Sequence, residues 1–224
     1  MSVYEAVMVC KEKSSKLYEK INITSVLRHI CCFGFGVLFS LAGFNESFSP
    51  FGVAFAGCVT KRFTVTATLG AVIGYFVALD SVSALRYTAS VLALTVVMTA
   101  LKSFKGLREH TLTPVVVSFT CVFVTGLAVV VSKDFSFFNL LITFCESTVG
   151  GAAAFVFCKS RVYLSMRGGI KTVTSKEITS IVITGAILLL AFKYVTVFGV
   201  SFAHIVATFL VLICSAYAKE SGGS

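Results

Sequence analysis

The feature that most constrains this chain is a succession of apolar runs separated by short polar segments. After a polar, basic stretch over residues 1–25, the apolar runs lie at about 27–44, 47–60, 63–79, 84–101, 113–131, 136–158, 178–192 and 201–218. A helix that crosses the hydrocarbon core of a bilayer needs about 20 predominantly apolar residues. We therefore predict an all-α fold, a polytopic membrane helix bundle with about eight transmembrane helices.

The composition argues against a water-soluble α/β enzyme. Of the 224 residues, 57% are hydrophobic and 13% are charged, whereas a soluble domain carries about 25% charged residues. Too few polar side chains remain to cover a soluble surface. We expect a cytoplasmic basic segment over 1–25, a transmembrane helical domain over 26–218, and a short C-terminal end over 219–224.

The basic residues predict an orientation. If all the runs cross and the N-terminus is cytoplasmic, 16 of the 19 Lys and Arg residues lie inside, and only Arg86, Lys133 and Lys193 lie outside. If the short run 47–60 instead entered and left the membrane on the same side, every later loop would change sides. Most of the basic residues would then lie outside. The positive-inside rule favours the first arrangement, with both termini cytoplasmic. The charge of +9 then marks topology, and no nucleic-acid partner is expected.

Glu146 lies deep in the run 136–158, where a carboxylate costs roughly 2.5–3.5 kcal/mol. One interpretation is an ion or proton relay or a substrate contact. The other is a structural carboxyl group that hydrogen-bonds between helices. No second acidic residue lies deep in any run, so the structural interpretation is favoured.

Small residues in the runs predict close helix packing, because small side chains let helix backbones approach in lipid. The candidates are Gly52, Ala56, Gly57, Gly70, Gly74, Gly150 and Gly151. The segment Ser49, Pro50, Phe51 and Gly52 has the pattern of a helix start, with a capping residue before proline. Tyr87, Tyr163, Tyr194 and Tyr217 fall near predicted membrane edges, as interfacial anchors do.

No catalytic, cofactor-binding or metal-binding residues can be assigned. The 8 cysteines include no C-x-x-C pair, the three histidines are far apart, and paired carboxylates are absent. We therefore expect that this chain is not itself an enzyme and holds no cofactor. The basic loop 159–176 could bind anionic lipid or a cytoplasmic partner, or could serve only as a topology signal.

Several motifs occur together in an order that resembles stage II sporulation protein E. They are Gly43 to Phe55 (GFNESFSPFGVAF), Leu85-Arg86-Tyr87, Glu146 with the small residues that follow it, Ser175-x-Glu177, and Phe198-Gly199-Val200-Ser201. Their order and spacing resemble that family from about residue 26 to the end of the chain.

The resemblance implies a sporulation-specific protein of the bacterial cytoplasmic membrane. In that family about ten membrane helices and a self-assembling region precede a Ser/Thr phosphatase domain that uses Mn or Mg. The phosphatase activates the forespore sigma factor by dephosphorylating an anti-sigma-factor antagonist. The family also associates with the tubulin-like division protein at the polar septum.

The chain ends at Ser221-Gly222-Gly223-Ser224, before the phosphatase motifs of that family. We therefore expect a fragment or a short form that serves as membrane anchor and assembly module, with the lipid bilayer and its own copies as partners. The alternative is a small transporter or the substrate-binding membrane subunit of one. An intramembrane enzyme is disfavoured because no paired catalytic residues exist.

Overall fold

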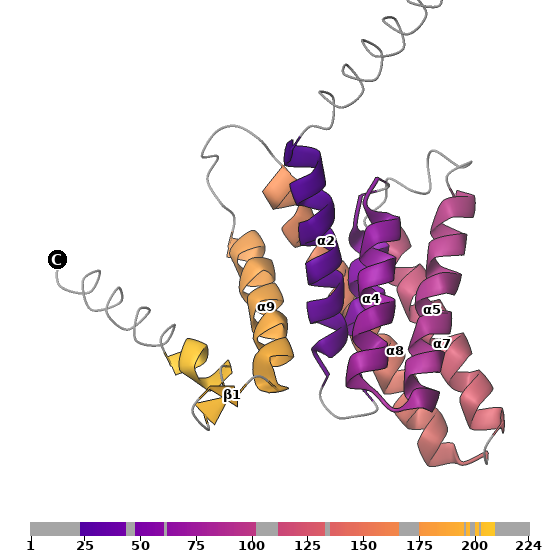
Figure 1. Ribbon diagram of the computed structural model, residues 1–224. Helices are drawn as coiled ribbons and strands as arrows, with labels where there is room; N and C mark the ends of the chain where they lie inside the picture. Colours follow the sequence, from indigo (N-terminus) through magenta and orange to yellow (C-terminus); the bar gives the residue numbers. More distant parts are fainter. Residues whose placement is uncertain are drawn as a thin grey trace, which may run out of the picture.

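A computed structural model describes residues 23–43, 48–60, 62–101, 112–132, 135–165, 175–194, 196–197, 200–201 and 203–208. The helices are α2 (Ile23–Leu41), α3 (Phe51–Cys58), α4 (Thr64–Ala78), α5 (Ser81–Ala100), α7 (Leu112–Ser132), α8 (Phe137–Ser165) and α9 (Ser175–Ala191). A 3-10 turn, η2 (Phe192–Tyr194), and two short antiparallel strands, β1 (Thr196–Val197) and β2 (Val200–Ser201), follow α9. The described part is thus almost entirely helical, as predicted (Figure 1).

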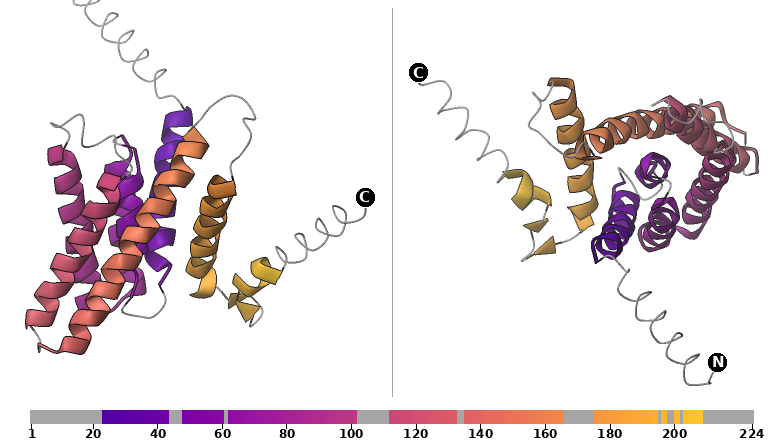
Figure 2. Two further views of the ribbon diagram at one scale, coloured as in Figure 1. Left: turned by 180° about the vertical axis from the view of Figure 1, so that it is seen from behind. Right: turned by 90° about the horizontal axis from the view of Figure 1, so that it is seen from above.

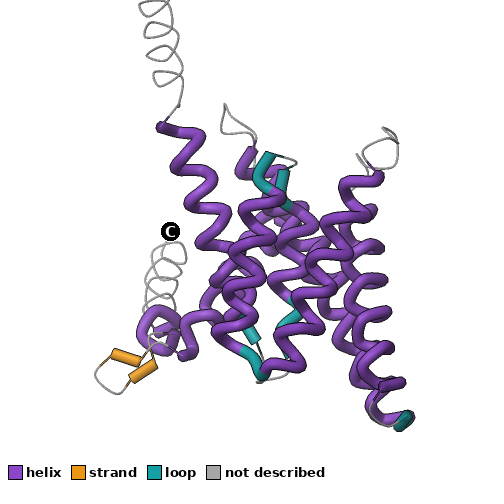
Figure 3. The backbone as a smooth tube through the Cα atoms, turned by 45° about the vertical axis from the view of Figure 1, so that its right-hand side comes forward, coloured by secondary structure: helices purple, strands orange, loops and turns teal. Residues whose placement is uncertain are grey.

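The helices form a bundle around α3. Seen from above, α5, α7 and α8 form an arc, and the indigo and purple helices of the N-terminal part lie inside it (Figure 2, right). All residues of α3 except Phe55 are buried. The two short strands lie outside the bundle, beside α9 (Figure 3). The short helix α3 therefore forms the centre of the fold, and longer helices cover it.

Three described helices are long and apolar enough to cross a membrane: Ser81–Ala100, Leu112–Ser132, and Phe137–Ser160 within α8. Ser25–Leu41, Thr64–Ala78 and Thr179–Ala191 are apolar but shorter. Large apolar side chains are exposed around the outside of the bundle, for example Leu69, Val96, Val124 and Phe138. An exposed apolar surface of this extent is typical of a face that meets lipid.

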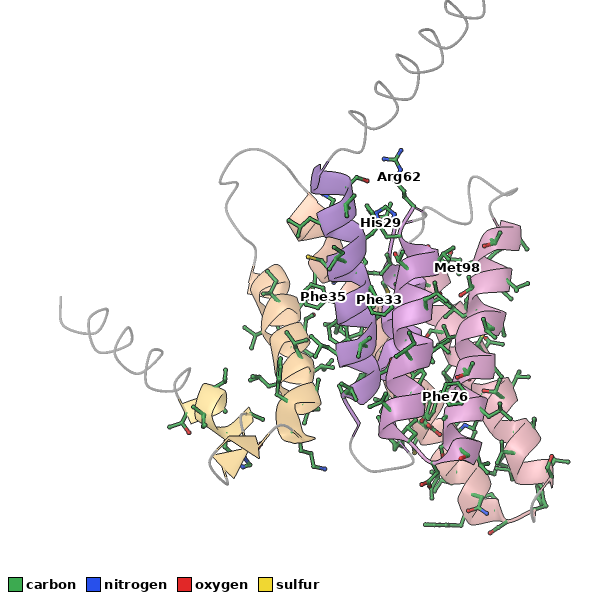
Figure 4. The ribbon with its side chains drawn as sticks, viewed as in Figure 1. His29, Phe33, Phe35, Arg62, Phe76 and Met98 are labelled. Atoms are coloured by element: carbon green, nitrogen blue, oxygen red, sulfur yellow. The ribbon has the colours of Figure 1, made fainter. Side chains whose placement is uncertain are left out.

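The connection between α2 and α4 contains one short helix, α3, with non-helical chain before and after it. Ser49 contacts the end of α2 through Ala42, whereas the Phe63 ring packs edge-on against His29 near the start of α2. Figure 4 shows His29 and Arg62 at one end of the bundle and Phe76 toward the other. The segment 49–63 therefore runs the length of α2 in the opposite direction. With eight residues, α3 itself spans only about 12 Å, and the chain covers the rest in non-helical conformation.

Two predicted boundaries differ from the structure. α8 continues to Ser165, past the expected end at 158, because the first glycines after it are Gly168 and Gly169 and nothing earlier stops the helix. The predicted eighth run, 201–218, begins with Ser201 in β2 and is helical over 203–208, and its other residues lie outside the described part of the chain. The expected segments 1–25 and 219–224 also lie outside them, apart from the first residues of α2.

α2 and α4 run parallel with their backbones in close contact. A Cβ atom added at Gly70 would overlap the carbonyl oxygen of Phe33, and one added at Gly74 would lie 2.8 Å from the carbonyl oxygen of Val37. On α2, a Cβ at Gly36 would lie 2.5 Å from the Ala67 carbonyl oxygen. Glycine at these positions allows the two backbones to touch.

Gly70→Ala should therefore force α2 and α4 apart and lower the free energy of unfolding by about 1–3 kcal/mol. Thermal unfolding of the detergent-solubilised protein measures the effect. Gly34→Ala is the matched control, because nothing lies within 4 Å of a Cβ built there and alanine is the better helix former. Equal midpoints for the two variants would contradict the close α2–α4 contact.

Candidate functional site: a broken helix held by tyrosines and an ion pair

The site begins at Ser49 and Pro50, which directly precede α3. Proline lacks a backbone N–H and disfavours the helical conformation of the residue before it. Helix α3 accordingly begins only at Phe51. Ser49 is fully buried, so its backbone N–H and carbonyl need partners within the protein.

Two tyrosine hydroxyls provide these partners. The Ser49 N–H donates to the Tyr87 hydroxyl at 2.9 Å, and the Tyr75 hydroxyl donates to the Ser49 carbonyl at 3.0 Å. The Tyr75 hydroxyl also accepts the Val53 N–H at 2.9 Å. The two rings stack with their centroids 5.0 Å apart. Helices α4 and α5 thus supply hydrogen-bond partners for the backbone N–H and carbonyl of Ser49, which lies outside any helix.

Gly52 makes room for this arrangement. A Cβ atom added there would lie 2.6 Å from the Tyr75 hydroxyl and would overlap the Ser40 hydroxyl. Any larger residue would displace Tyr75 from the backbone groups to which it bonds. In the Pro-Phe-Gly sequence, the proline therefore sets where α3 begins, and the glycine leaves space for the Tyr75 hydroxyl beside that start.

Ser49 does not cap α3, which corrects the role expected for it. The residue before α3 is Pro50, with no side-chain cap. The Ser49 hydroxyl instead donates to the carbonyls of Ser40 (2.7 Å) and Ala42 (3.1 Å) at the end of α2. The side chain turns toward α2 because the last carbonyls of a helix have no partner within the helix.

Glu146 pairs with Arg86. A guanidinium nitrogen of Arg86 on α5 donates to a carboxylate oxygen of Glu146 on α8. The side chains are only 14% and 2% exposed, so the pair is buried. Glu146 Oε1 and Arg86 Nε make no further hydrogen bond. Because the pair lies inside an apolar bundle, each charge depends on the other to offset the free-energy cost of its desolvation.

The ion pair is next to the broken helix. Gly150, one turn after Glu146 on the same face of α8, faces Pro50: a Cβ built on Gly150 would lie 3.3 Å from the Pro50 Cβ. Arg86 directly precedes Tyr87, and its guanidinium carbon lies 4.9 Å from the centre of that ring. The charges and the tyrosines together surround the start of α3.

Arg86 and Tyr87 lie near the start of α5. The charge count predicts Arg86 on the non-cytoplasmic side, the sequence predicts Tyr87 near a membrane edge, and both statements stay predictions. In the structure α5 begins at Ser81, after Asp80, so both residues lie in the second turn of the helix, and Tyr87 is fully buried. Asp80, a favoured residue before a helix, was the signal for the earlier start. Nothing in the sequence indicated that Tyr75 would bond Ser49.

The other candidate packing residues also lie at helix contacts. A Cβ on Gly57 would lie 3.2 Å from Leu94, and one on Gly151 would lie 3.4 Å from Phe119. Ala56 is 1% exposed and belongs to the cluster of buried residues around Tyr75 and Tyr87. Within the described residues, no group of three or more His, Cys, Asp or Glu side chains could hold a metal ion.

These features define a class of protein: an all-helical, apolar domain that packs around the short buried helix α3 and includes three described helices long enough to cross a membrane. The comparison with known families agrees with that class. The family described as SpoIIE, N-terminal domain, matches residues 1–224, the whole chain. The chain belongs to this family, which is the family that the collinear motifs predicted. No curated protein and no solved structure matches the chain.

Tyr87→Phe tests the first part of the site. Loss of the hydroxyl leaves the buried Ser49 N–H without its acceptor, which should lower the free energy of unfolding by about 1–3 kcal/mol. Thr120→Val is the control, because the exposed Thr120 hydroxyl donates to a carbonyl of its own helix and should change stability by less than about 0.5 kcal/mol. Unfolding midpoints in detergent compare the two, and an unchanged Tyr87→Phe midpoint would refute the role of the hydroxyl.

A double-mutant cycle tests the ion pair. Arg86→Gln or Glu146→Gln alone leaves one buried charge unpaired and should cost about 3–5 kcal/mol. The double variant should lose clearly less than the sum of the single losses, because no unpaired charge remains. The yield of folded protein and the midpoint of thermal unfolding are measured for each variant of the cycle. Arg62→Gln, at an exposed site, serves as the control. Strict additivity would show that the two charges do not stabilise each other.

Proposed function

We propose that this chain is the membrane anchor and assembly module of a sporulation Ser/Thr protein phosphatase. The observation that carries the proposal is the match of the SpoIIE N-terminal domain family over the whole chain. The membership supports a role in sporulation at a membrane. The catalytic work would then belong to a separate metal-dependent domain, and the chain itself would hold no cofactor.

The site supports a scaffold. The broken helix is fixed at its start by two tyrosine hydroxyls, and its neighbouring charges are paired. These hydrogen bonds join α3 to α4 and α5, and the ion pair joins α5 to α8, so they hold the helices in a fixed arrangement. A rigid bundle can present cytoplasmic segments in a fixed geometry, as expected of a module that self-associates and places a phosphatase at the polar septum. There it would work with the tubulin-like division protein and the anti-sigma-factor antagonist.

We further propose that the chain crosses the membrane eight times with both termini in the cytoplasm. The antiparallel course of the segment 49–63 along α2 supports this, because it returns the chain to the end where Arg62 lies. Arg28, near the start of α2, and Arg62 then share the cytoplasmic side, as the positive-inside rule requires.

Labelling of engineered cysteines tests the orientation. In a cysteine-free background, Asp80→Cys should react with a membrane-impermeant maleimide in intact spheroplasts. Ser103→Cys should react only after lysis, because α5 separates the two positions. The lysed sample controls for reactivity at both sites. Labelling of both positions from the same side would contradict a crossing by α5.

A fluorescent fusion tests the anchor role. In a sporulating host the fusion should concentrate at the polar septum, and the same fusion in vegetative cells is the control. Chemical cross-linking in those membranes should give oligomers of the fusion. A signal dispersed evenly around sporulating cells, without cross-linked oligomers, would overturn the proposal.

One observation favours transport as a second candidate. Short, discontinuous helices and buried charges are features of secondary transporters, and the short helix α3 and the buried Arg86–Glu146 pair occur here. A ligand-dependent rise of the unfolding midpoint that disappears in Glu146→Gln, in a variant that still folds, would favour this alternative.

A further inference from the structure

Two cysteines meet at the carboxyl end of α3. Cys58 is the last residue of α3, and Cys158 lies on α8. The Cys158 thiol donates to Cys58 Sγ, with the sulfurs 2.7 Å apart, and the Cys58 thiol donates to the Ala154 carbonyl at 2.9 Å. Both residues are buried, at 2% and 6% exposure. Neither the ion pair nor the tyrosine hydrogen bonds involve them.

The contact follows from the register of the two helices. α3 and α8 run parallel, with Pro50 opposite Gly150 at one end and Cys58 opposite Cys158 at the other. Sulfurs joined in a disulfide are about 2.05 Å apart, so bond formation requires the sulfurs to approach by less than about 1 Å. The helices can therefore keep their positions when the bond forms.

One of the two thiols borders a cavity. A space of about 250 Å³ between α2, α3, α8 and α9 is lined by Cys58, by the phenyl rings of Phe39, Phe55 and Phe157, and by Ser160 and Thr184. Cys158 does not line it. The space far exceeds the ~30 Å³ that one water molecule occupies, so a molecule as small as hydrogen peroxide fits beside Cys58.

We propose that Cys58 and Cys158 form a peroxide-sensitive dithiol whose reversible disulfide fastens the carboxyl end of α3 to α8. Cys58 reacts first because it borders the cavity. The Cys58 thiol loses its proton, and the thiolate attacks one oxygen of hydrogen peroxide. The O–O bond breaks, and the leaving hydroxide takes up the proton that the thiol lost to form water. Cys58 is then a sulfenic acid.

Cys158 completes the reaction. Its sulfur attacks the Cys58 sulfur, the S–O bond breaks, and a second water leaves with the Cys158 proton. Two thiols and one peroxide give one disulfide and two waters, and the two electrons pass from sulfur to the peroxide oxygens. A small dithiol such as dithiothreitol reverses the change. The amino end of α3 is already held by Tyr75 and Tyr87, so oxidation would fix both ends of this helix.

Thiol counting on membranes that contain the full chain tests the proposal. A variant that retains only Cys58 and Cys158 is treated with hydrogen peroxide, denatured, and labelled with a heavy maleimide. We expect both adducts to be lost after peroxide and regained after dithiothreitol. The matched control retains Cys58 and Cys145, which is exposed and lies on the same helix about 20 Å before Cys158 along the axis. It cannot form the disulfide, so after peroxide it should keep the Cys145 adduct and lose only the Cys58 adduct, as the sulfenic acid. Full labelling of the Cys58/Cys158 variant after peroxide would overturn the proposal.

Two further measurements test which cysteine reacts first and test the disulfide in the unaltered chain, where the folding of variants plays no part. With Cys158→Ser, a sulfenic-acid probe such as dimedone should label Cys58, whereas with Cys58→Ser it should leave Cys158 unlabelled. Labelling of Cys158 instead would overturn the assignment of Cys58 as the first to react. In the unaltered chain, mass spectrometry without reductant should find a Cys58–Cys158 cross-linked peptide after peroxide. Absence of this peptide would refute the disulfide by a measurement that uses no variant.

Discussion

The structure depends on one requirement: every backbone polar group inside an apolar bundle needs a partner within the protein. A continuous helix meets this requirement alone, whereas Ser49 lies before the start of α3, outside any helix. The Tyr75 and Tyr87 hydroxyls take over the bonds of Ser49, and the Ser49 hydroxyl bonds carbonyls at the end of α2. The position of α4 and α5 around α3 follows from these contacts.

The Arg86–Glu146 pair adds a second connection at the same place. A buried ion pair contributes little net stability compared with apolar residues of similar volume, yet breaking it is costly. Its effect is thus to specify which helices meet. It joins α5 to α8 across the start of α3, close to where Gly150 packs on Pro50. An anchor that must assemble in one fixed arrangement benefits from such a constraint, and a transporter could use the same charges differently.

Much of the fold could be predicted because lipid limits the options. The apolar runs gave α2, α4, α5, α7, α8 and α9 to within a few residues, since a helix is the only open-ended structure that satisfies its own backbone in lipid. The glycines at 70 and 74 indicated close packing, and the collinear motifs indicated the family that the whole chain matches. Boundaries were missed where polar residues continue a helix, as at the end of α8 and the start of α5.

The sequence by itself determined the membrane class, the helical segments, the helix start at Ser49 to Gly52 and the presence of one deep carboxylate. These are local properties, set by hydropathy and by the conformation of single residues. Only the tertiary structure decided that Arg86 is the partner of Glu146, that Tyr75 and Tyr87 bond the backbone of Ser49, and that Cys58 meets Cys158. These pairs are separated by 26 to 100 positions, and such contacts depend on the register and rotation of whole helices against one another, which no local pattern encodes.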